Sequence, residues 1–520
     1  MNKYIRLYQT IKYLRFKQIY FRVYYFLRNK YRVLIHFKYK NMEVPNKVLP
    51  LCLIPSIESY ASYDDKKFIF LNLSHTFTER IDWNFLKYGK LWCYNLNYFE
   101  FLNQNKIEKN EALFLMLDYI EQDADLVEGK EPFPLSLRGM NWIKFITFNN
   151  IENISIDKQL YNDYQVLMDN LEYHILGNHL LENGYSLLFG AYYFKDEKLY
   201  TKAKEILLLE LEEEILDDGG HYELSMMYHQ LMLFRLLDCI NLISNNDWHK
   251  NEIERFLRAK ASLMLGWLHQ ITYENGTIPL LNDSSVNIAP SSSELFMYAK
   301  RLGIKSKEEK LFQSGYRKIT FENYEAVIDI GNIGPDYILG HAHADTFNFE
   351  VQLKGNPFIV DMGLSTYENN ERRTLERSTK SHNTVEVKKQ NSSHVWGGFR
   401  VAQRAKVFNV KEDEFSFSAT HDGYLKEFGL LHTRKWEFSK EKIIIVDSLN
   451  EESEAVAYIH FYPNITKEMI ISKIKIVDGG DSHISTYKYA VGFNLLEDAY
   501  VLEISFKKEI TVEIIIEKDA

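Results

Sequence analysis

Two histidines separated by one residue, His341 and His343, are the part of the chain best suited to chemistry. They run into residues 346–353, whose apolar and polar side chains alternate as they do in a β-strand. Because residues i and i+2 of a strand point to one face, we expect both imidazoles to project into the same space. Asp361 and His382 follow on neighbouring strand-like segments. Two histidines and one aspartate from adjacent strands suit a divalent metal such as zinc. The alternative is that these histidines are buried and hydrogen-bonded without a metal.

Three segments in the first half of the chain carry further polar candidates, namely 136–142, 177–184 and 218–229. Asn178 suits a helix cap, and Arg138 suits an ion pair with a structural acid. Tyr228 and His229 suit a buried core in which their polar atoms are hydrogen-bonded. Each residue alone therefore has a structural explanation, and only the combination indicates a function.

The elements that position these candidates are first of all helices. From about residue 80 to residue 310, apolar side chains recur at intervals of three and four, which predicts amphipathic helices. Short connections marked by glycine or asparagine separate them. The clearest predicted helices are 113–120, 161–176, 180–193, 200–216, 222–243 and 252–273. Medium helices with short turns are typical of a bundle, solenoid or toroid.

The pattern changes after about residue 312. Short β-branched or alternating runs replace the helical spacing, and turn residues separate them. Examples are 318–321, 326–330, 415–418, 443–446 and 511–516. Many short strands in succession predict an antiparallel sandwich. We therefore divide the chain into an arm at 1–45, a helical domain at 46–311 and a β domain at 312–520.

Charge is distributed unevenly along the 520 residues, whose net charge is −10. Residues 1–40 contain eleven Lys or Arg and no acid, which leaves 51 Lys or Arg against 72 acids, or −21, in the remainder. The arm mixes aromatic residues with cations at roughly helical spacing. It suits either peripheral contact with an anionic membrane or docking on the acidic body. The acidic body argues against nucleic acid as a partner.

The compartment follows from weaker signals. No apolar run is long enough to span a membrane, and no Sec signal peptide is visible, which favours a cytoplasmic or inner-membrane-associated protein. Cys52, Cys93 and Cys239 are too few and too scattered for a disulfide framework. The 35 Tyr, 33 Phe and 7 Trp fit core packing as well as platforms for sugar rings.

Together these motifs resemble the heparinase II/III-like polysaccharide lyases and the related alginate lyases. The resemblance covers most of the chain and rests on several motifs in order. They are 92–99, Arg138 with Asn141-Trp142, Asn178-His179, 218–229, 282–284, 340–345, 377–379 and 382–385. The resemblance implies an incomplete (α/α) toroid followed by an antiparallel β-sandwich, which agrees with the helix-then-strand pattern.

The resemblance also implies residue roles. Asn178 and His179 match the positions that contact and neutralise a uronate carboxylate. Tyr228 matches the tyrosine that protonates the leaving oxygen, and His341 matches the catalytic histidine. The implied ligands of a mainly structural divalent metal, zinc in our prediction, are His343, Asp361 and His382. The predicted substrate contacts are Arg138, Trp142, His229 and Arg377.

Residues of these types suit β-elimination from a 4-O-linked uronate. The C5 proton is α to a carboxylate and weakly acidic, so amide and imidazole donors must stabilise the charge that develops. A His or Tyr accepts the C5 proton, and a Tyr hydroxyl protonates the departing O4. Our leading hypothesis is a lyase for an acidic, uronate-containing bacterial glycan. The basic arm looks like that of heparinase-like proteins of surface-polysaccharide biosynthesis, which favours a capsule, O-antigen or exopolysaccharide.

Three alternatives stay open from the sequence. A uronate C5-epimerase shares the proton abstraction with a lyase. A non-catalytic glycan-binding or assembly protein would use the aromatic residues and the arm. A glycoside hydrolase needs two placed carboxylates, for which the candidates are Glu182, Glu223 and Asp283. The family resemblance would also place the protein in the cell envelope or periplasm. The oligomeric state is left open.

Overall fold

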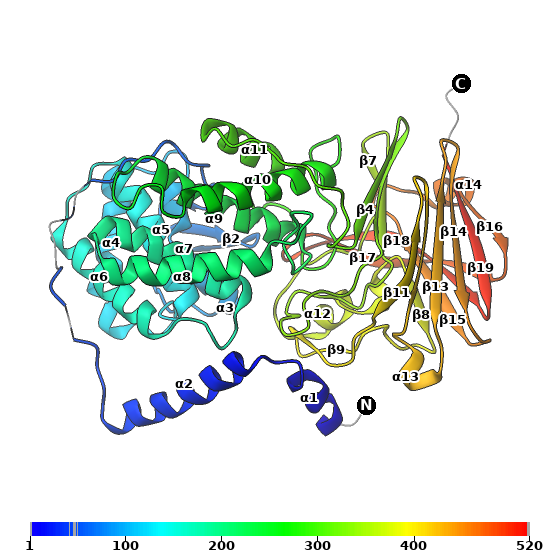
Figure 1. Ribbon diagram of the computed structural model, residues 1–520, viewed down its shortest axis with the longest axis horizontal. Coiled ribbons are helices and arrows are strands. Elements are labelled where there is room, and N and C mark those ends of the chain that lie inside the picture. Colours follow the sequence, from blue (N-terminus) through cyan, green and yellow to red (C-terminus); the bar gives the residue numbers. More distant parts are fainter. Residues whose placement is uncertain (1–2, 41, 45–47, 49, 517–520) are drawn as a thin grey trace.

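The computed structural model describes residues 3–40, 42–44, 48 and 50–516. A helix-rich half and a sheet-rich half lie side by side, and the arm lies below both in the view of Figure 1. Helices dominate from residue 90 to residue 301, and strands dominate from residue 316 to residue 515. The predicted order, a helical toroid and then an antiparallel sandwich, is confirmed. The predicted boundary at 311/312 falls in the connection between the last helix of the first half and the first strand of the second.

The helical half has an inner and an outer layer. Helices α5, α7 and α9 are buried along nearly their whole length, whereas α4, α6, α8 and α10 bury one side. Outer and inner helices alternate along the chain, which is the arrangement of an (α/α) toroid. The bounds are α3 Lys90–Tyr98, α4 Lys109–Glu121, α5 Pro132–Phe148, α6 Ile154–Asp169, α7 Gly177–Phe194, α8 Glu197–Glu214, α9 Met226–Ser244, α10 Glu254–Ile271 and α11 Ser292–Arg301. A small sheet of β1 Tyr63–Asp64, β2 Lys67–Phe70 and β3 Leu73–Thr76 precedes them.

The start of α7 is built by two residues with positive φ. Leu176 has φ 68° and Gly177 has φ 61°, so the chain turns sharply just before Asn178 and His179. A Cβ on Gly177 would lie 2.5 Å from Cδ1 of Ile338 and 3.0 Å from Oε1 of Glu223. Glycine is therefore required both for the backbone conformation and for the close approach of these neighbours.

One predicted helix is displaced along the chain. We expected a helix over 161–176, whereas α6 covers Ile154–Asp169. The side chain of Asn153 accepts hydrogen bonds from Ser155 N and Ile156 N and so caps the helix start. The apolar side chains after residue 170 belong to the turn that leads into α7. Apolar spacing alone does not distinguish that turn from another helical turn.

Three antiparallel sheets of the sheet-rich half share one core, and β9 and β10 form a separate two-stranded sheet. Their strand orders are β4-β5-β6-β7, β17-β18-β15-β8 and β11-β12-β13-β14-β19-β16. Strands β13 and β14 alternate buried and more exposed side chains, as strands do when one face covers a core. The bounds are β4 Tyr316–Phe321, β5 Tyr324–Asp329, β6 Phe349–Leu353, β7 Asn356–Ile359, β8 Val385–Val387, β11 Val407–Glu412, β12 Ser416–His421, β13 His432–Phe438, β14 Lys442–Leu449, β15 Ala455–His460, β16 Ile474–Asp478, β17 Asp481–Gly492, β18 Leu495–Phe506 and β19 Glu509–Ile515. The connections include β9 Val395–Trp396, β10 Arg400–Val401, α12 Glu371–Glu376, α13 Leu425–Phe428 and α14 Lys467–Lys473.

The placement of His341 and His343 on a strand was wrong. Strand β6 begins only at residue 349, and residues 340–345 form an irregular loop between β5 and β6. The Arg377 side chain donates to Ala342 O at 2.8 and 3.1 Å, and Ala344 N donates to Arg377 O at 3.0 Å. These long-range bonds satisfy the loop backbone in place of a neighbouring strand.

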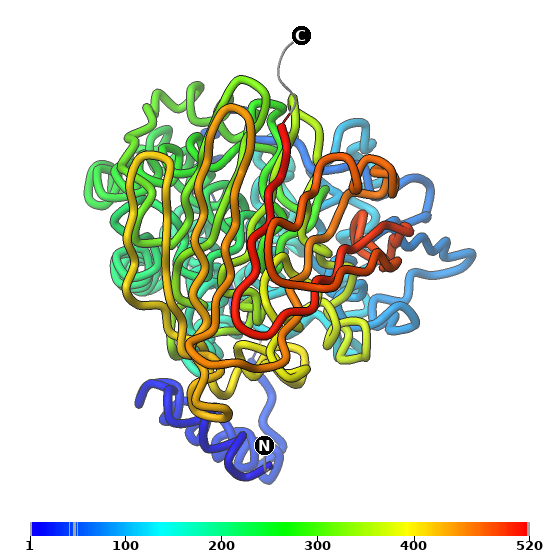
Figure 2. Tube along the Cα trace, turned by 90° about the vertical axis from the view of Figure 1, so that its right-hand side faces the viewer, coloured from blue at the N-terminus to red at the C-terminus, as the bar shows by residue number. Residues whose placement is uncertain are grey.

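The arm forms two helices, α1 Lys3–Ile11 and α2 Phe16–Leu34. It docks on the body as one of the two sequence alternatives predicted. Arg15 pairs with Glu213, and Arg28 and Arg32 both pair with Asp169. Figure 2 shows both helices along one edge of the molecule. In the described part of the chain, no helix is long and apolar enough to cross a membrane.

Candidate active site

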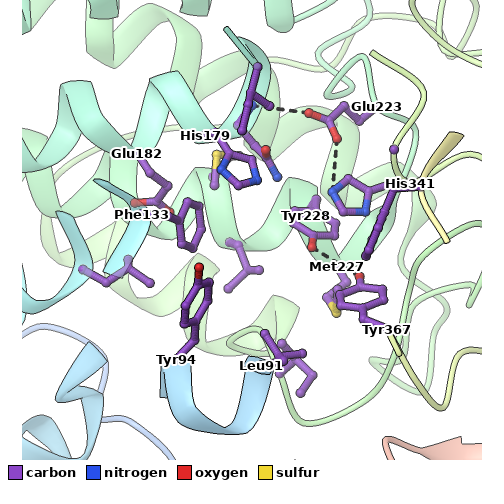
Figure 3. Close-up of a pocket in the computed structure, with 18 of the residues that line it drawn as sticks. Leu91, Tyr94, Phe133, His179, Glu182, Glu223, Met227, Tyr228, His341 and Tyr367 are labelled. Carbon is purple, nitrogen blue, oxygen red and sulfur yellow. Dashed lines mark hydrogen bonds and ion pairs between the residues drawn. The ribbon is translucent and has the colours of Figure 1, made fainter. Parts of the chain in front are cut away.

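A cavity of about 970 Å³ lies where the toroid, the loop before β6 and the arm meet. It receives side chains from α5, α7 and α9, from the 336–341 segment and from both arm helices. Figure 3 shows residues of the toroid and the sandwich facing this space together. Four predicted catalytic residues line it, namely Asn178, His179, Tyr228 and His341.

Tyr228 and His341 form the centre of the site. Their rings lie 3.9 Å apart between centroids with an interplanar angle of 30°. The Tyr228 hydroxyl lies 3.2 Å from the Tyr367 hydroxyl. Burial raises the pKa of Tyr228 above its usual value, so its phenol stays protonated at neutral pH. The geometry therefore suits Tyr228 as a proton donor rather than as a base.

Asp283 fixes the orientation of the His341 ring. Its Oδ2 lies 2.9 Å from His341 Nδ1, and its Oδ1 lies 2.8 Å from His343 Nε2. Arg373 donates to both oxygens, at 2.5 and 2.7 Å. Burial alone would raise the pKa of Asp283, but the Arg373 charge and the two imidazoles hold it well below its usual range. The ionised carboxylate accepts the Nδ1–H of His341 and leaves Nε2 available to accept a proton.

Glu223 connects the two halves of the site. Its Oε2 lies 3.5 Å from His341 Nε2, and its Oε1 accepts the backbone N–H of Asn178 at 3.3 Å. Both contacts are drawn in Figure 3. One carboxyl group therefore separates Asn178 from His341. Asn178 and His341, which we predicted from two distant parts of the sequence, therefore contact the same carboxyl group.

His179 carries a second carboxylate partner. Its Nδ1 lies 2.9 Å from Oε1 of Glu172, whose Oε2 accepts from Asn183 at 3.1 Å. Burial would lower the pKa of His179, but the charge and hydrogen bond of Glu172 raise it overall. Phe133 packs 4.8 Å from the His179 ring. The imidazole is thus held at the cavity wall in a setting that favours its cationic form.

Glu182 lies one turn beyond Asn178 on α7 and also lines the cavity. Burial and the nearby Glu100 charge raise the pKa of Glu182 to about 7, although Arg235 opposes the shift. Oε1 of Glu182 lies 3.5 Å from Nε of Arg235. A neutral carboxyl group here can donate a hydrogen bond to an anion in the cavity, whereas the ionised form would repel one.

The four predicted substrate contacts do not line the cavity. Arg138 is fully buried and bonds Asp163 at 2.9 Å and Gly129 O at 2.9 Å. Trp142 lies in an aromatic cluster with Phe99. Internal partners therefore replace the substrate contact that we predicted for both residues, and this part of the prediction is corrected.

The other two predicted contacts support the site from behind. His229 accepts the His221 N–H at Nδ1 and donates from Nε2 to Met264 O, at 3.2 and 3.0 Å. Burial lowers the pKa of His229 to about 4, so it is neutral and supplies no charge to Tyr228. Arg377 holds the loop that carries His341, through the bonds to Ala342 described above.

The predicted metal ligands lie close together; two of them, His382 and Asp361, bond each other, and His343 bonds Asp283. His382 Nδ1 lies 2.6 Å from Asp361 Oδ2, and the rings of His343 and His382 are 5.2 Å apart. Nδ1 of His343 and Nε2 of His382 are buried without a hydrogen-bond partner. Within residues 3–40, 42–44, 48 and 50–516, no group of three or more His, Cys, Asp or Glu is arranged so that it could hold a metal ion.

Sequence reasoning missed the residues that organise the site. Asp283 and Glu223 belong to the 282–284 and 218–229 motifs but were given a role only as carboxylates for a hydrolase, and Glu172, Tyr367 and Arg373 were given none. Asp283 is closed off by Arg373 and two histidines, so it does not serve a hydrolase as a free acid or base. The only signal in the sequence was the 282–284 motif, because the partners of Asp283 lie 58 to 90 residues away.

A toroid joined to a sandwich, with a tyrosine and a histidine stacked over the cavity between them, defines a protein of the polysaccharide-lyase class. Two family models match it in succession: the heparinase II/III N-terminus over residues 141–302 and the heparinase II/III-like C-terminal domain over residues 305–520. The chain belongs to the heparinase II/III-like family.

Individual relatives are distant. A heparin-sulfate lyase of Bacteroides stercoris is 24% identical over 246 residues, which cover 42% of this chain and 37% of that protein. The crystal structure of a heparinase III superposes with a TM-score of 0.70 at 17% identity, over 93% of this chain and 88% of that one. Heparan sulfate lyase HepC from Pedobacter heparinus gives 0.54 at 16% identity, over 88% and 82%. At these identities the structures establish the shared fold.

Proposed function

We propose that the protein cleaves a uronate-containing acidic glycan by β-elimination. The observation that carries the proposal is the stacked pair of Tyr228 and His341, set 3.9 Å apart in a cavity between two domains. His341 Nε2 is the nitrogen that takes the C5 proton, because Asp283 occupies Nδ1 at 2.9 Å whereas Glu223 approaches Nε2 only to 3.5 Å. Tyr228, which is protonated, then gives its proton to the departing O4. The electron pair of the C5–H bond forms the C4–C5 double bond as the C4–O4 bond breaks.

The opposite wall suits the uronate carboxylate. Asn178 and a cationic His179 stand in the first turn of α7, where the helix dipole also favours negative charge. Neutral Glu182 adds a donor at the next turn of the helix. These groups stabilise the negative charge that develops on the carboxyl group when the C5 proton leaves.

The substrate class follows from the cavity mouth. Arg22 of α2 and Arg400 of β10 both line the cavity, and neither forms an ion pair with another residue in the described ranges. Burial and the neighbouring Arg400 charge lower the pKa of Arg22, which is what two adjacent cations without an acid produce. Trp396 and Phe399 line the same rim and offer surfaces for sugar rings. We propose a bacterial surface polysaccharide with repeated acidic groups as the substrate.

Tyr228→Phe tests this assignment. The variant removes one hydroxyl, so turnover should fall by about a hundredfold or more while glycan binding changes little. Activity is read as the ultraviolet absorbance of unsaturated uronate on a panel of acidic polysaccharides. Tyr424→Phe, which removes a buried hydroxyl in the sandwich core, is the matched control and should keep full turnover. Full activity of Tyr228→Phe on a cleaved polymer would contradict the assignment.

The same reaction in deuterated water separates the alternatives. A lyase produces unsaturated ends, whereas a C5-epimerase places deuterium at C5 of an intact chain. A glycan-binding protein does neither. Because Tyr228 and His341 both line the cavity, this geometry suits a lyase and a C5-epimerase alike. The product formed decides between them.

We also propose that His343, Asp361 and His382, which are not arranged as a metal site in this structure, shift to hold a structural divalent metal, with zinc as the expected ion. The support is the donor set and the two buried ring nitrogens that lack a partner. The metal would stabilise the packing of the 340–345 loop against the sandwich. Purified protein should contain about one metal per chain by elemental analysis, and chelation should lower the melting temperature by several degrees.

The matched variants for the metal are His343→Ala and His432→Ala. Both histidines are buried and bond an aspartate, but His432 lies within the sandwich next to Asp447. Only His343→Ala should abolish the metal content. No stoichiometric metal in the parent protein, together with unchanged stability after chelation, would remove this proposal.

A further inference from the structure

Helix α2 of the arm has its polar and apolar faces reversed. The side that contacts the body follows the spacing 18, 21, 25, 28 and 32, and its only fully buried residue is Gln18. Gln18 donates to Ile175 O at 2.9 Å and to Tyr337 O at 3.3 Å. Arg28 and Arg32 on the same side pair with Asp169. The helix is thus fastened to the body largely by polar bonds.

The outward side of α2 is apolar. Phe16 is 81% exposed, Leu27 is 59% exposed and Leu34 is 77% exposed. At 100° per residue they share one stripe, because they are eleven and seven residues apart. Further exposed members of this outward face are Ile19, Tyr20, Val23, Tyr24, Phe26, Tyr31 and Val33. A surface helix of a soluble domain normally turns such a stripe toward the core, and a contiguous exposed patch of this kind marks an interaction site.

The neighbouring segments extend the same surface. Ile5 and Tyr8 of α1 are exposed, and Ile35 and Phe37 continue the apolar surface beyond α2. Both arm helices project along one edge of the molecule in Figure 2, so a flat partner can reach the outward face without meeting the body. The face that we call the outward face consists of the exposed apolar residues between 5 and 37, apart from Leu7 and Ile11, which line the cavity.

Charge indicates what covers this face. Lys12, Lys30 and Lys38 are exposed and form no ion pair with another residue in the described ranges. Residues 1–40 contain no acid, so two copies packed face to face would bring like charges together. Anionic lipid headgroups complement these cations, and the acyl region accepts the apolar stripe. Aromatic residues and long cationic side chains are the types that suit the membrane interface.

We propose that the outward face of the arm binds the surface of an anionic lipid bilayer, with α2 lying in the plane of the membrane. The inference stands independently of the catalytic proposal. Leu7, Ile11, Leu14 and Arg22 of the same arm line the catalytic cavity. Membrane binding would therefore hold the mouth of the cavity beside the bilayer, where a membrane-associated acidic glycan would meet it.

Flotation of the full chain with vesicles tests the proposal. Vesicles of phosphatidylcholine with 30% phosphatidylglycerol should carry the protein, and pure phosphatidylcholine should carry at least tenfold less. Raising salt from 50 to 500 mM should weaken binding severalfold, since surface attraction is screened. The triple variant Phe16→Gln, Leu27→Gln, Leu34→Gln should reduce flotation at least tenfold, because it removes the stripe and keeps the docked side.

The matched control changes three exposed apolar residues elsewhere, Phe114→Gln, Met297→Gln and Ile471→Gln, on helices α4, α11 and α14. It should float like the parent. A second measurement does not depend on the triple variant: Leu27→Trp should be quenched by brominated lipid, and Phe114→Trp should not. Circular dichroism and thermal unfolding check that the variants are folded.

Three outcomes would overturn the proposal. The first is no flotation of the parent on either vesicle, and the second is equal flotation of the parent and the triple variant. The third is a parent dimer in solution that the triple variant dissociates while Leu27→Trp remains unquenched, which would show that a second copy covers the face.

Discussion

Two buried aspartates, one in the connection between α10 and α11 and one on β14, have almost the same partners and very different surroundings. Asp283 binds Arg373 and the imidazoles of His341 and His343. Asp447 binds Arg434 through both oxygens, at 2.6 and 2.7 Å, and His432 at 2.7 Å. Arginine and histidine hold the pKa of each carboxyl below its usual value despite burial.

The difference lies in what the attached histidine can reach. His432 is buried, and its other ring nitrogen, Nδ1, lies 3.0 Å from Nε2 of His421, which is also buried. His341 instead presents Nε2 to Glu223 and the cavity. The same Asp–Arg–His chemistry therefore stabilises the core in one place and orients a proton acceptor in the other. Recognising a functional cluster requires its position relative to a cavity as well as its composition.

The largest expected effect comes from removing one charge at each cluster. Asp283→Asn should lower turnover by about a thousandfold, because the amide can hold His341 in the wrong tautomer and leaves Arg373 unpaired. Asp447→Asn should lower the melting temperature about as much as Asp283→Asn does, but it should leave the turnover of folded protein within about twofold. Turnover per folded molecule, measured beside thermal unfolding, checks the pair.

Equal losses of turnover in the two variants would break the comparison, since the Asp283 cluster would then act only through stability. Circular dichroism first checks that both variants are folded at the assay temperature, because the turnover of an unfolded variant cannot be compared. His341→Gln also tests whether this cluster affects turnover directly or only through stability, because it leaves Asp283 and Arg373 in place.

These clusters also show why the sequence predicted some parts of the site and not others. Asn178, His179 and Tyr228 sit on α7 and α9, whose periodicity and motifs were visible in the sequence, and the structure places all three at the cavity. Arg138 and Arg377 look like substrate contacts in the sequence, but Asp163 and Ala342, 25 and 35 residues away, occupy them. No local pattern reveals whether a cation is already satisfied by a remote partner.

The prediction for the loop around His341 failed for the same reason. Alternation after residue 346 is real and forms β6, but the histidines precede the strand. Their positions depend on Asp283, Arg373 and Arg377, which come from distant segments. The overall class was predictable because it depends on periodicity summed over many residues. The loop was not, because it depends on a few nonlocal polar bonds.

A smaller effect separates these ionised clusters from Glu182, the carboxyl group whose pKa is raised to about 7. Its folded-state pKa exceeds the usual unfolded value of 4.5, so the folded protein prefers the neutral acid, and stability falls as pH rises from about 4.5 to about 7, above which both states are ionised. Between pH 6 and pH 8 the neutral fraction of Glu182 falls about tenfold. Because the ionised form repels a substrate carboxylate, KM should rise by about tenfold over this range while kcat changes less.

Glu182→Gln should make KM nearly independent of pH over the same range, because the amide is neutral throughout and still reaches Arg235. Its melting temperature should also fall less than that of the parent between pH 6 and pH 8. Glu386→Gln is the control, since burial also raises the pKa of Glu386 but its side chain lies in the sandwich and bonds Tyr458. That control should keep the rise in KM. A parent enzyme whose KM is flat from pH 6 to pH 8 would show that Glu182 does not face the substrate carboxylate, and the assignment of the α7 wall would then rest on Asn178 and His179 alone.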